Sequence, residues 1–343
     1  MREALRARIL ALIARLADGS RDDLERDALL ADLAAYQRER VEPYARLMAR
    51  RPKAALPADV FRYARVASFD PQFTSRIFRT SGTTSGARGE HAFRDLSIYD
   101  AAALAAARHA LFPDAPQMRL VMLAPHPDEV PDSSLSYMLG RFEPWFASRC
   151  DWVWRGGALD AGRLAIVLAE AQSSGEPIAL LGTSFALVHA EERLQETFRL
   201  PIGSRIMQTG GFKGRSRELE PEALRAALGA RYGVPGERIV AEYGMTELSS
   251  QMYETLDASS RRLYWVPGWV RARAVDPETL EPRPDGELGV LRIDDAANLD
   301  SVSAIQTSDL ARIHGGRIEL VGRAPGAQLR GCSLAVEEAL DGR

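Results

Sequence analysis

An alternation of short apolar runs with helix-like stretches, between about residues 120 and 247, most constrains the fold of this chain. Apolar runs such as LVMLAP (120–125) and IALLG (178–182) are separated by helical segments such as PEALRAALGARYG (221–233). Strands that alternate with helices indicate a layered α/β fold with a parallel-rich sheet. Beyond about residue 260, strand-like runs such as GELGVLRID and GRIELVG predict a β-rich later part.

The first 50 or so residues have a helical pattern instead. Leu5, Ile9, Leu12 and Leu16 are three or four residues apart, which places them on one helix face. Arginines and acidic residues take the other face. We therefore expect this region to pack its apolar face on the main domain.

The composition limits the class of partner. The chain has 343 residues, 46% of them hydrophobic, enough to bury one large core or two modest ones. Its net charge of −3, from 44 basic and 47 acidic residues, offers no basic footprint for nucleic acid. Apolar runs such as PIALLGTSFALV (177–188) are shorter than the roughly 20 residues of a membrane helix.

The N-terminal segment and the cysteines indicate the compartment. The segment has neither a continuous apolar region nor a small-residue cleavage site, so we expect no signal peptide. The two cysteines, Cys150 and Cys332, make neither a disulfide framework nor a zinc site. We therefore expect a cytoplasmic protein.

The stretch FRTSGTTSGARGEH (78–91) has the composition of a phosphate-binding loop. Glycines let the main chain approach a ligand closely, backbone N–H groups and small hydroxyls donate hydrogen bonds, and Arg88 adds a cation. The GK[ST] signature is missing after Gly86, so this is not the loop of P-loop nucleotide hydrolases. We expect the helix-like stretch after it to add a positive helix end. Taken alone, such a loop is also typical of an ordinary surface turn.

Three further segments carry polar groups suited to a ligand. EYGMTE (242–247) follows an apolar run, at the kind of strand end where open α/β sheets bind ligands. TSDLARI puts Asp309 at the end of another strand-like run, suited to accept hydrogen bonds from two neighbouring hydroxyls. GGFKGRSR (210–217) combines three glycines with Lys213 and two arginines, which suits a positively charged wall.

Taken in order, TSGTTSGARG, EYGMTE, TSDLARI and VGR resemble the motifs of the adenylate-forming (ANL) superfamily of acyl-CoA synthetases, adenylation domains and luciferases. The longer strings FRTSGTTSGARGEH, LLGTSFALVH, IMQTGGFKGRSRE, YGMTELSSQMYE and LRGCSL are similar to one branch, the acyl-protein synthetase (LuxE-type) family. The resemblance extends from about residue 75 to the C-terminus. It implies an ANL-type α/β domain over residues 76–322. An N-terminal helical region over 1–75 would pack on it, and a short tail over 323–343 would replace the usual C-terminal domain.

The resemblance also implies that the protein binds ATP and Mg²⁺. The phosphate loop would hold the β- and γ-phosphates through Thr80, Ser81, Gly82, Thr83, Thr84 and Gly86. Glu247 would bind Mg²⁺ and Asp309 the ribose hydroxyls. We expect main-chain amides near Ser81 and these two carboxylates to converge on one Mg·ATP.

Further residues would contact the nucleotide. Tyr243, next to Gly244, would stack on adenine, and Gly210 and Gly211 would border the ring. Thr246 would contact the α-phosphate. Arg323 corresponds to the arginine at the hinge of relatives.

The implied reaction is activation of a carboxylic acid, in this family a fatty acid, as an acyl-adenylate with release of pyrophosphate. Catalysis of this kind depends mainly on positioning and on neutralising charge. Relatives supply a catalytic lysine from their C-terminal domain, whereas only 343 − 323 = 20 residues follow Arg323 here. Lys213 is the first candidate for a replacement cation, with Arg215 and Arg330 as alternatives. Arg88 stands where relatives usually carry a lysine.

Cys332 is the candidate nucleophile for the second step. It corresponds to the cysteine near the C-terminus to which LuxE-type enzymes pass the acyl group, and neighbouring cations favour the reactive thiolate. The acyl group would then move to a partner protein or carrier protein. Cys150 we interpret as structural.

Several residues follow the ends of predicted strands and are expected to border the acid. His126 follows one strand, and Thr183, Ser184 and Phe185 follow another. His91 closes the phosphate loop, where contact with phosphate and loop packing are both open as roles.

Two other functions are left open. A compact ligase could deliver the adenylate directly to acyl carrier protein, coenzyme A or an amine, without use of Cys332. A non-catalytic adenylate-binding protein could keep the loop as a relic, although the complete set of loop hydroxyls, Glu247 and Asp309 argues against this.

Overall fold

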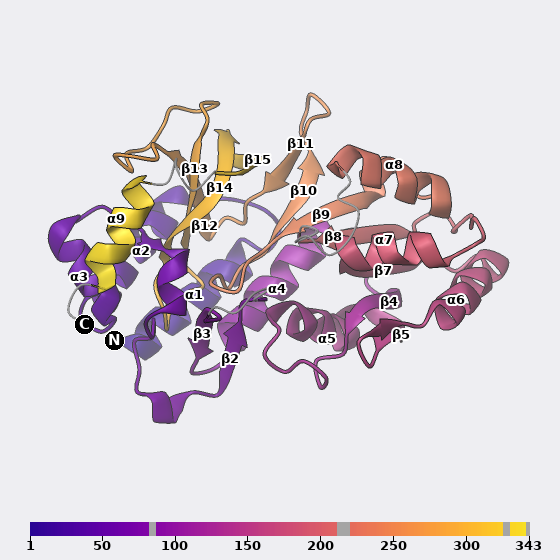
Figure 1. Ribbon diagram of the computed structural model, residues 1–343, viewed down its shortest axis with the longest axis horizontal. Helices are drawn as coiled ribbons and strands as arrows, with labels where there is room; N and C mark the ends of the chain where they lie inside the picture. The colour runs from indigo at the N-terminus through magenta and orange to yellow at the C-terminus, as the bar shows by residue number, and fades with distance from the viewer. Residues whose placement is uncertain (82–86, 211–219, 325–329, 341–343) are drawn as a thin grey trace. The chain divides into compact units, whose positions relative to one another are not determined.

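The computed structural model is drawn in Figure 1. The described residues are 1–81, 87–210, 220–324 and 330–340, and the description of 330–333 is limited to the backbone. No helix within these residues combines the length and the apolar character needed to cross a membrane.

Contacts within the chain define two compact units. Unit 1 consists of Met1–His109, Met245–Met252 and Asp257–Arg343, and unit 2 consists of Ala110–Gly244 and Tyr253–Leu256. Each unit combines several segments of the chain, so the two units do not correspond to the predicted ranges 1–75, 76–322 and 323–343. Those three ranges stay a prediction.

Unit 2 contains a mostly parallel sheet with helices. Its strand order is β10–β9–β8–β7–β4–β5–β6, and the pairs from β9 to β5 in this order are parallel. The strands are β4 (Met118–Pro125), β5 (Ala147–Arg155), β6 (Ala158–Leu159), β7 (Ile178–Thr183), β8 (Arg205–Thr209), β9 (Ile239–Tyr243) and β10 (Met252–Leu256). The helices are α5 (Ser134–Phe146), α6 (Ala161–Ser174), α7 (Ser184–Arg193), α8 (Pro221–Tyr232) and the 3-10 helix η3 (Gly236–Arg238).

An apolar cluster packs helices α6, α7 and α8 against this sheet. Val121 of β4 and Leu180 of β7 are fully buried in it, together with Leu164, Leu187 and Leu228 of the three helices. Complete burial of each such side chain stabilises the fold by about 1.5–3 kcal/mol. The cluster therefore fixes the sheet against its helices and determines where the strand ends lie within the unit.

The N-terminal helices of unit 1 are α1 (Arg2–Arg15), α2 (Asp23–Arg38) and α3 (Glu42–Arg50). Leu5, Ile9, Leu12 and Leu16 are all buried, which confirms the predicted apolar face. Asp22 caps helix α2, because its carboxylate accepts a hydrogen bond from the Glu25 N–H. These helices pack against one another and belong to the core of unit 1.

Unit 1 also contains an antiparallel sheet of the order β12–β13–β14–β15–β11, which confirms the predicted β-rich later part. Its strands are β11 (Arg262–Trp265), β12 (Val270–Val275), β13 (Gly289–Asp295), β14 (Ala304–His314) and β15 (Arg317–Arg323). The short β1 (Leu56–Pro57) pairs in parallel with β14. The 3-10 helix η1 (Ala58–Arg62) follows directly and contacts β14.

The predicted phosphate loop connects two strands rather than a strand and a helix. After the 3-10 helix η2 (Pro71–Phe73), β2 (Arg76–Arg79) and β3 (Glu90–Phe93) pair as an antiparallel hairpin, with Phe78 opposite His91. Helix α4 (Ser97–Ala110) begins only after β3. The expectation of a helix end at the loop is therefore wrong, because EHAF pairs with RIFR before the helix begins.

The last described element is helix α9 (Arg330–Leu340), drawn in yellow beside α3 in Figure 1. It packs on α3, β1 and η1, with Ala335 and Ala339 fully buried. An ion pair of 2.7 Å between Arg51 Nε and Glu338 Oε2 adds to this contact. The end of the chain that carries Cys332 is thus packed within unit 1.

Candidate active site

The described part of the phosphate-loop hairpin is closed by its own side chains. The Thr80 hydroxyl accepts a hydrogen bond of 2.9 Å from the Gly89 N–H, and the Thr80 N–H donates one of 3.0 Å to the Gly89 carbonyl. Arg88 folds back and donates to the carbonyls of Thr80 and Arg79. Thr80 and Arg88 therefore shape the base of the loop, while Gly82, Thr83, Thr84 and Gly86 lie outside the described residues.

A second part of unit 1 carries Thr246 and Glu247 in an irregular segment after β9. His91 Nδ1 lies 2.8 Å from the Thr246 carbonyl, and Asn298 Nδ2 donates a 2.8 Å hydrogen bond to the Glu247 carbonyl. Downstream, the buried Asp295 accepts hydrogen bonds from the Ser249 and Ser250 N–H groups. The hairpin strand β3 and the segment after β13 thus hold the Glu247 segment.

The Glu247 carboxyl is buried and electrostatically unusual. Burial raises its pKa to about 7, while its own backbone N–H and the charges of Arg62 and Arg323 oppose that rise. Among the described residues, only its own backbone N–H donates a hydrogen bond to this carboxyl. A carboxyl held this way fits a divalent cation, whose charge would favour the ionised form.

The rest of a cation site would have to come from the ligand. No group of three or more His, Cys, Asp or Glu side chains suited to a metal ion occurs within the described ranges. Mg²⁺ is commonly held by one or two carboxylates together with substrate phosphates and waters. Glu247 alone therefore fits a Mg²⁺ that arrives with a nucleotide.

Asp309 and Arg323 face each other on neighbouring strands of unit 1. They are register partners of β14 and β15, and Arg323 Nε lies 3.3 Å from Asp309 Oδ1. The sequence placed Asp309 at the end of a strand, which is wrong, because β14 continues to His314. A register shift between Leu310 and Ala311 interrupts the pairing just after Asp309. Such irregularities re-aim side chains and are common next to active sites.

Unit 2 gathers the residues predicted to border adenine and the acid at one edge of its sheet. Thr183, Thr209 and Glu242 are register partners on the parallel strands β7, β8 and β9. Tyr243 is the last residue of β9, and His126 directly follows β4. Carboxyl ends of parallel strands are where open α/β sheets bind ligands.

Local hydrogen bonds fix the polar groups at this edge. The Thr183 hydroxyl accepts a 3.0 Å bond from the Ala186 N–H, so β7 ends and α7 begins within one residue. The Ser184 hydroxyl donates a 2.9 Å bond to the Gly210 carbonyl. Gly210 has φ of 70°, a left-handed conformation that favours glycine. Gly211 and Lys213, with the two arginines that follow, lie outside the described residues.

The other two predicted acid-site residues lie among aromatic rings. His126 packs edge-on against Trp152 with ring centroids 4.8 Å apart. Phe185 packs against Trp154 and stacks on His189, each at 6.0 Å between centroids. Both residues therefore contact aromatic rings within unit 2, and His126 Nδ1 also accepts a 3.3 Å hydrogen bond from the Asp128 N–H.

Sequence reasoning missed Glu242 as a separate group. This carboxyl is buried, accepts a hydrogen bond from the Thr209 hydroxyl, and has its pKa raised by burial to about 7. A side chain on Gly244 would require the buried Glu242 carboxyl to shift. The signal available in the sequence was a carboxylate at the last-but-one position of an apolar run.

The two cysteines differ in position. Cys150 lies on β5, and burial raises the pKa of its thiol to about 12, so it stays protonated and unreactive at neutral pH. Cys332 lies in the first turn of α9.

Solved structures of other proteins identify the class of fold. The chain is similar to 2-hydroxyisobutyryl-CoA ligase in complex with 2-HIB-AMP and CoA, with a TM-score of 0.61 and 14% identity, over 88% of this chain and 69% of that one. It is also similar to ATP-bound MatB from Rhodopseudomonas palustris, with a TM-score of 0.51 and 17% identity, over 76% of this chain and 49% of that one. The fold is that of the adenylate-forming ANL enzymes, which confirms the predicted α/β class.

Sequence comparison then identifies the family. The model of the acyl-protein synthetase, LuxE, family matches residues 50–341. The chain therefore belongs to the LuxE acyl-protein synthetase family, as its motifs predict.

Two similar proteins are both long-chain-fatty-acid–luciferin-component ligases. That of Vibrio harveyi is 26% identical over 180 residues, 49% of this chain and 47% of that protein. That of Aliivibrio fischeri is 33% identical over 107 residues, 29% of this chain and 27% of that protein. The match thus spans about half of the first relative's length and less of the second's.

Proposed function

We propose that this protein is an AMP-forming ligase that activates a fatty acid with ATP and passes the acyl group to a thiol. The observation that carries the proposal is the buried Glu247 carboxyl, which has no ion-pair partner among the described residues and lies in the unit that also holds the phosphate-loop hairpin and Asp309. Family membership and the names of the two relatives support a long-chain fatty acid as substrate.

In the first step, a carboxylate oxygen of the acid attacks the α-phosphorus of ATP. The new bond joins that oxygen to phosphorus, the bond from phosphorus to the α,β-bridging oxygen breaks, and pyrophosphate leaves with the electron pair. Mg²⁺, when bound at Glu247, would offset charge on the phosphates. Asp309 would orient the ribose, and Thr246 would donate to the α-phosphate.

In the second step, the Cys332 thiolate attacks the acyl carbon of the adenylate and AMP leaves. The match of the LuxE family model supports this role, because residues 50–341 include Cys332. The packing of α9 on η1 supports it as well, because the charges of Asp59 and Arg62 on η1 act on Glu247. The acyl group would then pass to a thiol of a partner or carrier protein.

The proposal is tested by acid-dependent exchange of pyrophosphate into ATP, measured across short, aromatic and long-chain acids. We expect exchange with long-chain acids, and background exchange with every acid would refute the ligase activity. Intact-mass analysis then detects the acyl group on the protein.

Paired cysteine variants test the relay. Cys332→Ser should keep pyrophosphate exchange but lose the acyl-protein mass, whereas Cys150→Ser should keep both. Acyl transfer to an acceptor that survives Cys332→Ser would instead support a ligase that transfers the adenylate directly.

A further inference from the structure

The segment that carries Thr246 and Glu247 belongs to neither a helix nor a strand. Within it, the Leu248 N–H donates a 3.0 Å hydrogen bond to the Met245 carbonyl, which leaves the two carbonyls between them to other partners. A buried carbonyl requires a hydrogen-bond donor, and here no β-ladder supplies one. Side chains from elsewhere in unit 1 take that place.

His91 supplies the first donor. Its Nδ1 lies 2.8 Å from the Thr246 carbonyl, and because a carbonyl only accepts, Nδ1 must carry the proton. The ring is fully buried against Phe93 and Phe61, with centroids 4.1 and 5.7 Å away, and burial lowers its pKa to about 4. At neutral pH the ring is therefore neutral with one fixed tautomer.

Asn298 supplies the second donor. Its amide donates a hydrogen bond of 2.8 Å to the Glu247 carbonyl and one of 3.1 Å to the Val302 carbonyl. The side chain of Gln37 on α2 holds the backbone of the same segment at two points. It donates a hydrogen bond of 2.6 Å to the Asn298 carbonyl and accepts one of 2.9 Å from the Ser303 N–H.

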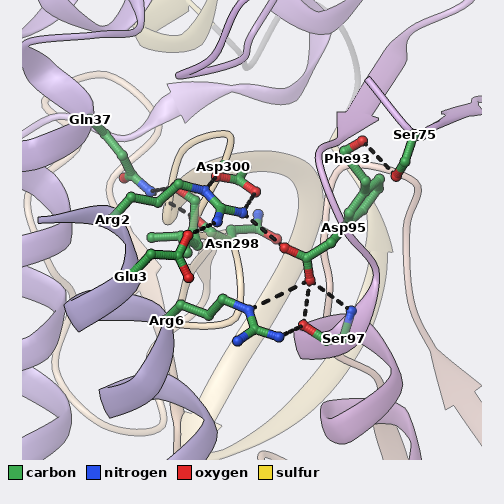
Figure 2. A network of polar contacts seen from close by, with 11 residues as sticks. Arg2, Glu3, Arg6, Gln37, Ser75, Phe93, Asp95, Ser97, Asn298 and Asp300 are labelled. Atoms are coloured by element: carbon green, nitrogen blue, oxygen red, sulfur yellow. Dashed lines mark hydrogen bonds and ion pairs between the residues drawn. The ribbon is translucent and has the colours of Figure 1, made fainter. Parts of the chain in front are cut away.

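The N-terminal helix anchors the same segment, as Figure 2 shows. Arg2 of α1 bonds both oxygens of Asp300, at 2.7 and 2.5 Å, and reaches Asp95 at 3.0 Å. Asn298 is thus fixed to the N-terminal helices as well as to the Glu247 segment.

We propose that His91 and Asn298 are positioning residues, which hold the consecutive carbonyls of Thr246 and Glu247 and so fix the peptide from which the Glu247 side chain projects. The proposal rests on the function proposed above. If it holds, His91 connects strand β3, which follows the predicted phosphate loop, to the segment that carries the proposed Mg²⁺ ligand Glu247. Hydrogen-bond partners that orient a metal ligand are worth about 10–100-fold in metal affinity or activity, and we expect an effect of that order here.

Two substitutions of His91 separate its hydrogen bond from its packing. His91→Phe keeps an aromatic ring but removes the donor, whereas His91→Asn loses the ring but keeps an N–H near the position of Nδ1. We measure dissociation constants of Mg·ATP and of ATP with EDTA by calorimetry. His91→Phe and Asn298→Leu should weaken Mg·ATP binding about 10–100-fold and leave metal-free ATP binding unchanged, and His91→Asn should lie closer to wild type.

Two outcomes would overturn the positioning role. One is equal weakening in His91→Asn and His91→Phe, which would indicate packing alone. The other is a dissociation constant of Mg·ATP that stays the same in both His91→Phe and Asn298→Leu. A role in stability alone would lower the unfolding temperature without changing the ratio of the two dissociation constants.

A measurement on the ligand-free protein separates this inference from the proposed function. Nitrogen-15 spectra of the imidazole should show a protonated Nδ1 for His91 at neutral pH, and a protonated Nε2 would refute the hydrogen bond. If wild type bound no Mg·ATP while Nδ1 were protonated, the proposed function would fail and the bond would stand.

A small cavity behind this pair points to a bound water. It has a volume of about 10 Å³, the size of one water, and its walls include His91, Ser249 and Asn298. Of these lining residues, Ser249 and Asn298 each have a buried oxygen, Oγ and Oδ1, without a hydrogen-bond partner among the described residues. We infer that one ordered water occupies the cavity and bonds both atoms. A crystal structure should show it, and an empty cavity would refute this inference.

Discussion

Glu242 and Glu247 begin and end one six-residue motif, and burial raises the pKa of each carboxyl to about 7. The cause is loss of hydration, which disfavours the charged form of a carboxyl. Glu242 has the Thr209 hydroxyl as a partner, whereas Glu247 has the charges of Arg62 and Arg323 near it. We expect the Glu242 carboxyl to stay neutral and the Glu247 carboxyl to ionise when a cation binds.

Glu242→Gln should change how stability depends on pH. Between about pH 4.5 and 7 the folded wild type binds more protons at Glu242 than the unfolded chain does. The free energy of unfolding therefore falls as pH rises through that window, by up to about 3 kcal/mol. The variant has no carboxyl at this position, so its free energy of unfolding should not fall in this way. Urea titrations should therefore show that its stability relative to wild type rises toward neutral pH. Parallel pH profiles would contradict the assignment, and Glu237→Gln, at an exposed site, serves as control.

Asp309→Asn should weaken ATP binding with little effect on stability. A carboxylate that accepts from two hydroxyls loses charge-assisted hydrogen bonds worth about 1.5–3 kcal/mol each, so KM for ATP should rise at least about 10-fold. The ion pair with Arg323 is exposed on the arginine side and contributes little to folding. Exchange kinetics at varied ATP measure the effect. An unchanged KM for ATP would remove Asp309 from the nucleotide site.

At the scale of elements, two connections within unit 1 bring distant segments to the same place. The β2–β3 hairpin flanks the predicted phosphate loop and, through His91, contacts the Glu247 segment. Helix α9 packs on α3, β1 and η1 and carries Cys332 in its first turn. Helix α9 therefore packs on the element whose charges act on Glu247.

Ala335→Glu should detach α9 from unit 1. A carboxylate at this fully buried position would be an unpaired charge, which destabilises the docked helix by roughly 3 kcal/mol or more. Hydrogen exchange should show loss of protection over residues 334–340, and acylation of Cys332 should fall while pyrophosphate exchange persists. Leu334→Glu, at a site 49% exposed on the same helix, is the matched control. Equal effects of the two variants would argue that α9 is not docked by this face.

At the scale of the whole molecule, the two units have different architectures and different parts of the proposed chemistry. Unit 2 is a parallel α/β layer whose strand ends carry Thr183, Glu242 and Tyr243. Unit 1 combines helices with an antiparallel sheet and carries Glu247, Asp309 and the phosphate-loop hairpin. The motif EYGMTE crosses from one unit to the other along the chain.

Mg·ATP should stabilise the folded chain more than ATP alone. A ligand at about 100 times its dissociation constant adds about 2.7 kcal/mol, which raises the unfolding temperature of a chain of this size by about 4 °C. With EDTA in place of Mg²⁺ the rise should be smaller, because Glu247 then lacks its cation. Glu247→Gln should respond equally to both mixtures. A wild-type rise that is the same with and without Mg²⁺ would contradict a cation site at Glu247.

Local pattern determined the type and order of most elements. The run IALLG corresponds to β7, PEALRAALGARYG to α8, and the spacing from Leu5 to Leu16 to the buried face of α1. The same kind of local signal named the family, because the phosphate loop and EYGMTE are contiguous strings. Apolar period and turn residues act over a few positions, so one sequence suffices to recognise them.

Pairing and burial were decided only by the tertiary structure. Three findings depend on which strands meet: β2 and β3 pair on either side of the predicted phosphate loop, Asp309 lies within β14 opposite Arg323, and Asn298 holds the Glu247 carbonyl from 51 residues away. The raised pKa of Glu242 depends on what excludes water from it. Register and desolvation arise from residues far apart in the chain, and for that reason no local pattern contains them.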